Sequence, residues 1–120
     1  MRLLANDDPA QTTRARRAID AAAGEPVLLN DVVLAETVWT MRSRRKARKD
    51  EIAMLVTSLL EAPAFAFESR ETLAHALALY RSSTAGYAAC MIVAKNQSLG
   101  ARETLSFDED FRRLPTARLI

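Results

Sequence analysis

Apolar residues recur at helical spacing over two long stretches of the chain. Residues 50–61 have apolar side chains at positions i, i+3, i+4, i+7 and i+8, which predicts an amphipathic helix. A similar stripe predicts a second helix that begins after Ser69 and runs to about residue 81. The two stripes comprise Ile52, Leu55, Val56, Leu59 and Leu60 in the first helix and Leu73, Ala76, Leu77 and Tyr80 in the second.

Capping residues delimit three further helices. Asp8 and Pro9 predict a helix start, and Gly24 predicts its stop, which gives a helix over 9–23 with Ala15, Ile19 and Ala22 on one face. Asn30 and Asp31 precede a helix with an apolar stripe at Leu34, Val38 and Met41. Residues 84–98 form another helix, which Gly100 closes.

Short apolar runs between these helices predict strands. They are PVLL at 26–29, FAF at 65–67, ETLSF at 103–107 and TARLI at 116–120. Strands separated by helical crossovers indicate an α/β fold with a mostly parallel sheet covered by helices on both faces. At 120 residues the chain is expected to be one domain, 1–120.

Composition says more about where the protein is found than about the reaction it performs. The net charge of +2, from 17 basic and 15 acidic residues, is mild. Cys90 is the single cysteine, so no disulfide forms within the chain, and a cytoplasmic location is expected. The longest apolar run, 87–94, is shorter than the roughly 20 residues of a membrane span, and the first residues lack the apolar core of a signal peptide.

Acidic residues follow two of the predicted strands. Glu36 lies early in the helix after PVLLN, and Asp108 and Asp110 follow the strand of LSFDEDFRRL. Open α/β sheets place their ligand sites at the carboxyl ends of strands, so these acids are expected to face one crevice. Carboxylates there suit Mg²⁺ or Mn²⁺, which activates water and positions a phosphodiester. Any one of these acids taken alone is more commonly a solvated helix acid or a cap.

The whole chain resembles VapC-like PIN-domain toxins, the ribonucleases of bacterial VapBC toxin-antitoxin pairs. The resemblance rests on successive segments, namely RLLANDDPAQTTRARRAI, VLLNDVVLAETVWTMRSR, RKDEIAMLVTSLLEAPAFAFE, TLAHALALYRSSTAGYAACMIVAKNQSLG and ETLSFDEDFRRLP. It implies a three-layer α/β/α sandwich, Mg²⁺- or Mn²⁺-dependent endoribonuclease activity on structured RNA such as tRNA or rRNA, a homodimer, and a VapB-like antitoxin partner.

The resemblance also implies roles for particular residues. Glu36 falls on the helix acid of the L-x-E-T segment, and Asp108 falls on the acid that follows the fourth strand of the family. These two residues are the expected catalytic and metal-binding acids, with Asp110 as an auxiliary metal ligand. Ser106 falls on a small hydroxyl residue two positions before Asp108 and is expected to contact substrate.

Two departures from the family pattern predict impaired catalysis. The family begins with a strand bearing a D-x-N motif, and this sequence starts at Met1, after that strand. The third acid of the family opens a D-A-x-I-A-A pattern. In this sequence Ala89 occupies the position of that acid. With two of four acids lost, we expect weak metal binding and little or no hydrolysis, although Mg²⁺ sometimes uses only one or two carboxylates. A non-catalytic PIN-like protein that binds antitoxin or RNA is the alternative.

A basic run between the second and third predicted helices has two readings. It places six cations within residues 42–49, with no acid among them, and Arg44, Arg45 and Lys46 at its centre. Such a run suits RNA phosphates, but it also suits a solvated helix end. Its proximity to Glu36 in the sequence favours contact with the RNA substrate or the antitoxin. A helix-turn-helix reading of this region is disfavoured because the turn has no Gly and strands are interleaved with the helices.

The sequence assigns no functional role to three other side chains. Trp39 lies off the apolar stripe of its helix, so it faces either the core or a second helix or dimer partner. His75 is expected on the surface, and Cys90 is expected to be a small buried apolar residue. The sequence contains no motif for a P-loop, a Rossmann nucleotide site, a zinc protease or a thioredoxin-type site.

Overall fold

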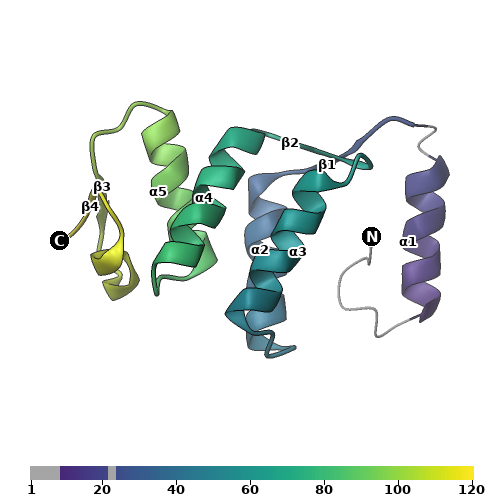
Figure 1. Cartoon of the computed structure of the whole chain (residues 1–120), viewed down its shortest axis with the longest axis horizontal. Helices are drawn as coiled ribbons and strands as arrows, with labels where there is room; N and C mark the ends of the chain where they lie inside the picture. Colours follow the sequence, from purple (N-terminus) through teal and green to yellow (C-terminus); the bar gives the residue numbers. More distant parts are fainter. Residues whose placement is uncertain (1–8, 22–23) are drawn as a thin grey trace. The chain divides into compact units, whose positions relative to one another are not determined.

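The structure is a computed structural model that describes residues 9–21 and 24–120. The described chain forms two compact units, 1–68 and 69–120, and each is presented by itself. The first unit, in purple to teal in Figure 1, contains α1 (Pro9–Ala21), β1 (Val27–Leu29), α2 (Asp31–Ser43), α3 (Lys49–Glu61) and β2 (Phe65–Phe67). The second contains α4 (Arg70–Ser82), α5 (Tyr87–Ser98), β3 (Thr104–Ser106), the 3₁₀-helix η1 (Glu109–Arg113) and β4 (Ala117–Leu119).

Every strand pair in the described chain is parallel, which confirms the predicted α/β class. In the first unit β1 pairs with β2, and Val27 lies opposite Phe65. In the second unit β3 pairs with β4, and Thr104 lies opposite Ala117. Parallel pairing requires crossover connections, and the helices between the paired strands of the first unit supply one.

Most residues of the stripes predicted for α2, α3 and α4 are buried in the core of their unit. In the first unit α2 packs on α3, with Ile52 and Val56 almost fully buried. In the second unit α4 and α5 lie side by side, as Figure 1 shows, and all four residues of the predicted α4 stripe are buried. Cys90 is fully buried and His75 is exposed, as predicted.

The α1 stripe is less buried than the pattern predicts. Ala15 is exposed and Ile19 is half-buried, while Ala22 and the Asp8 cap lie outside the described residues. None of the helices in 9–21 and 24–120 is long and apolar enough to cross a membrane.

An ion pair joins the two strands of the second unit. Arg118 on β4 donates from Nη2 to Glu103 Oε1, just before β3, at 2.9 Å. This hydrogen bond, with the nearby positive charge, holds the pKa of Glu103 below its ordinary value of 4.5 and raises that of Arg118. The pair is solvent-exposed, so its contribution to stability is small and sensitive to salt.

We expect the Glu103→Gln variant to lose a small part of the pH dependence of stability. Because folding lowers the Glu103 pKa, the pair stabilises the fold above pH 4.5 and this stabilisation is lost as the pH falls through the folded-state pKa. Urea unfolding of both proteins should therefore differ at neutral pH and converge in acid. High salt should shrink the difference at neutral pH, and a gap that persists in acid would contradict the ion-pair explanation.

Candidate functional site

Glu36 lies on the solvent-facing side of α2. The helix begins after Asn30, whose side-chain Oδ1 accepts a hydrogen bond from Val33 N at 2.8 Å, as expected of an N-cap. The opposite side of the helix is buried through Leu34 and Val38, which are 2% and 5% exposed. This start and this buried stripe leave the Glu36 carboxylate exposed in the second turn of the helix.

Asp108 is held in the short connection between β3 and η1. Ser106 Oγ accepts from Asp108 N at 3.0 Å, and Asp108 Oδ1 accepts from Asp110 N at 2.9 Å. The two contacts fix the backbone on both sides of an exposed carboxylate. Asp108 Oδ2 has no hydrogen-bond partner within the described residues, so one oxygen is available to a ligand.

The Asp110 carboxylate is engaged in a hydrogen bond within the second unit. Its Oδ2 accepts a hydrogen bond from Gly86 N, the N-cap of α5, at 2.8 Å. A carboxylate there satisfies an orphan backbone N–H and complements the positive end of the helix dipole. A Cβ on Gly86 would lie 3.1 Å from Oδ2, so the close approach favours glycine. The sequence predicted Asp110 as a metal ligand and missed this capping role.

A second contact ties η1 to the start of α5. Arg113 Nη1 donates to Thr84 Oγ1 at 2.7 Å, and Phe111, between the two contacts, is buried. The segment after β3 is therefore fastened to the residues before α5 at two points. Local sequence patterns gave no sign of this pairing, because the partners are 24 and 29 residues apart.

Ala89 is buried within α5 of the second unit. It is 5% exposed and stands beside Cys90, which is fully buried. A carboxylate at this position would be largely removed from solvent.

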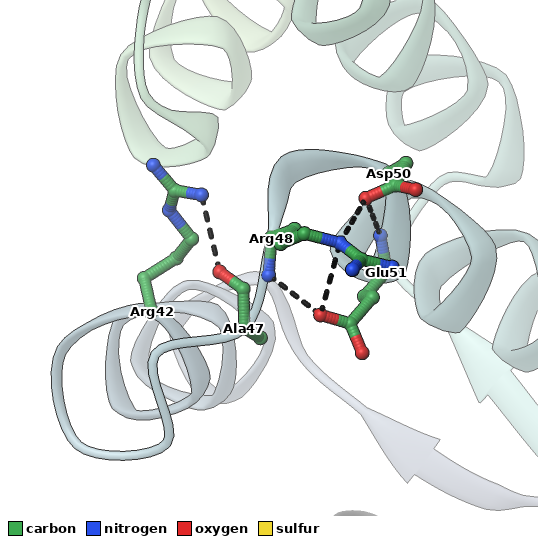
Figure 2. Close-up of polar contacts among 5 residues, drawn as sticks. All are labelled: Arg42, Ala47, Arg48, Asp50 and Glu51. Carbon is green, nitrogen blue, oxygen red and sulfur yellow. Dashed lines mark hydrogen bonds and ion pairs between the residues drawn. The ribbon is translucent and has the colours of Figure 1, made fainter.

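The basic run closes α2 and opens α3. Arg42 Nη1 donates to Ala47 O at 3.1 Å, and Arg48 Nε pairs with Asp50 Oδ1 at 3.2 Å. Figure 2 draws both contacts as dashed lines. Glu51 Oε1 also accepts from Arg48 N, as in one half of a capping box. The Arg48 hydrogen bond holds the pKa of Asp50 below its ordinary value of 3.8. Two of the six cations, Arg42 and Arg48, thus form contacts within the turn and the start of α3.

The cations at the centre of the run are exposed. Arg44 and Lys46 make no side-chain hydrogen bond or ion pair with any other described residue, whereas Arg45 has a partner. Lys46 adopts a left-handed conformation with φ of 54°, and Ala47 N then donates to Met41 O at 2.9 Å. The turn therefore projects two unengaged cations, Arg44 and Lys46, just beyond the end of α2.

The predicted site residues fall into two groups. The first unit holds Glu36 and the three central cations, and the second holds Ser106, Asp108, Asp110 and Ala89. Within neither unit do three or more side chains of His, Cys, Asp or Glu among the described residues gather closely enough to hold a metal ion. One or two carboxylates with bound waters are enough for many Mg²⁺ sites, so Glu36 and Asp108 stay candidate ligands.

Comparisons with known proteins identify one family. The sequence model of the PIN domain matches residues 1–117, nearly the whole chain. No curated protein and no solved structure gave a match.

Proposed function

We propose, from the premise that this chain belongs to the PIN domain family, that it is a VapC-like endoribonuclease toxin with impaired catalysis. PIN domains are generally metal-dependent nucleases. The impairment rests on one observation, the buried Ala89 at a position where the resemblance implies a metal-binding Asp. Glu36 and Asp108 are then the surviving catalytic acids, and Mg²⁺ or Mn²⁺ is the metal.

The charge distribution of the first unit supports RNA as the substrate. Arg44, Arg45 and Lys46 lie on the turn that follows the helix bearing Glu36. Exposed cations on the segment that follows this helix would hold phosphates, with the salt sensitivity expected of counterion release. Ser106 is proposed as a further substrate contact beside Asp108.

A non-catalytic PIN-like protein that binds antitoxin or RNA is the second candidate. The observation that favours it is the commitment of the Asp110 carboxylate to Gly86 N, which leaves one fewer acid for a metal. Under either function the proposed partners are RNA, a VapB-like antitoxin and a second copy of the chain, in the cytoplasm.

RNA cleavage by the purified chain tests the proposal. With candidate tRNAs and Mn²⁺ we expect little or no cleavage, because Ala89 stands where the family pattern has an acid. Restoring Asp at Ala89 should recover activity partly, and adding an upstream strand with the D-x-N motif should recover more. Recovery supports the impaired toxin, and its failure in the doubly restored protein supports the binding protein. Robust, EDTA-sensitive cleavage by the unaltered chain would contradict impairment.

A further inference from the structure

We propose that the outer face of α2 binds an unpaired nucleotide of single-stranded RNA, with the base stacked on Trp39 and the phosphates held by Arg44 and Lys46. This inference rests on the proposed function, since it states how RNA would be held beside Glu36. It assigns a role to an aromatic residue that the family resemblance left without one.

The outer face of α2 is a stripe at helical spacing opposite the core. Val32, Glu36, Trp39 and Ser43 succeed one another at intervals of four, three and four residues, so their side chains share one side of the helix. Val32 is 70% exposed and Trp39 is 58% exposed, which excludes the core position that the sequence left open for Trp39. The exposed indole, with its flat apolar ring, is open to stacking against a ligand.

The backbone around this stripe is held in place. Ser43 Oγ donates to Trp39 O at 2.6 Å, and the Arg42 contact to Ala47 O closes the following turn. The unengaged cations, Arg44 and Lys46, thus project from a turn that is already organised before a ligand arrives. Such preorganisation reduces the entropic cost of binding.

Charge favours a nucleic acid over a second copy of the chain. A symmetric dimer through this face would place Arg44 and Lys46 of both copies in one interface with Glu36 as the one acid of the stripe in each copy, so positive charge would remain in excess. An RNA strand offers both complementary features, namely a flat base for the indole and phosphates for the cations. Base stacking on aromatic side chains is the usual way in which proteins hold single strands with little sequence preference.

Trp39 is the single tryptophan, so intrinsic fluorescence reports directly on this surface. We would titrate the full chain with a short unstructured RNA and with an abasic analogue of equal length, following Trp fluorescence and the anisotropy of labelled RNA. Quenching is expected with the RNA and not with the abasic analogue, which keeps the phosphates and lacks the bases.

Variants separate the stacking from the charge. Trp39→Ala should weaken RNA binding on the order of 10-fold with an unchanged salt dependence, and Trp39→Phe should retain much of the affinity. The Arg44→Ala/Lys46→Ala double variant should lower the slope of log K against log salt by about 1.4, from about 0.7 for each phosphate contact. Met54→Ala, an exposed apolar residue on α3, and Arg102→Ala, an exposed cation in the second unit, serve as controls and should bind like the unaltered chain.

Three results would overturn the inference. RNA binding in anisotropy without quenching, and with full affinity in Trp39→Ala, would exclude stacking while the proposed RNA-binding function stands. No RNA binding at all would defeat the proposed RNA substrate together with this inference. Loss of self-association in Trp39→Ala, measured by light scattering, with unchanged RNA affinity would assign the face to a second copy.

Discussion

The Ala89→Asp variant is expected to be less stable than the unaltered chain by about 1–3 kcal/mol, the usual cost of burying a polar group without a partner. Ala89 is 5% exposed, and its neighbours Cys90 and Val93 on α5 are fully buried. Ionisation there is disfavoured by desolvation, so the new carboxyl should have a raised pKa. Its penalty should therefore be smallest in acid and grow as the pH rises above about 4, where the unfolded chain ionises. Urea unfolding at several pH values measures this.

Ala88→Asp is the matched control for that variant. Ala88 is exposed in the same first turn of α5, where the helix dipole favours an acid, so both variants share the favourable electrostatic effect and differ in burial. Equal stability of the two variants would contradict the burial argument. If Mn²⁺ then stabilises Ala89→Asp and leaves Ala88→Asp unchanged, the carboxylate at 89 binds metal in the folded state, as the impaired-toxin proposal requires.

Local sequence signals predicted most elements because the forces that define them are local. Asn30 and Ser69 each cap a helix through their own side chains, as their positions before apolar stripes indicated. The start of α5 was wrong by three residues: the predicted helix begins at 84 and the observed one at Tyr87. At that boundary Gly86 N donates to Asp110, a long-range contact that no local pattern encodes.

The candidate site shows the same division between local and long-range information. The sequence pattern placed Glu36 early in α2 and Asp108 shortly after β3, and the structure has both residues there. Spacing could not reveal that η1 would follow Asp108, nor that Asp110 would turn toward α5. It also left Trp39 undecided, because an indole off the core stripe is compatible with several neighbours. The surroundings of these side chains depend on residues distant in sequence.

The Asp110→Ala variant is expected to lose about 1–2 kcal/mol of stability, as for removal of a helix N-cap side chain. The change leaves Gly86 N without its acceptor and removes the negative charge from the positive end of α5. Asp110→Asn should lose less, because an amide oxygen still accepts the hydrogen bond while the charge is gone. Urea unfolding of the two variants separates the hydrogen bond from the charge, and far-UV circular dichroism reports any loss of helix.

Glu109→Ala is the control that distinguishes capping from a general effect of acids in η1. Glu109 forms an exposed pair with Arg112 at 3.0 Å, and pairs of this kind contribute at most about 0.5 kcal/mol. Stability of Asp110→Ala equal to that of Glu109→Ala would contradict the capping role and return Asp110 to the set of candidate metal ligands. If capping holds, the order of stability is the unaltered chain, then Asp110→Asn, then Asp110→Ala, and it should be the same with and without Mn²⁺. A metal-dependent order would mean that the carboxylate leaves Gly86 to bind the ion.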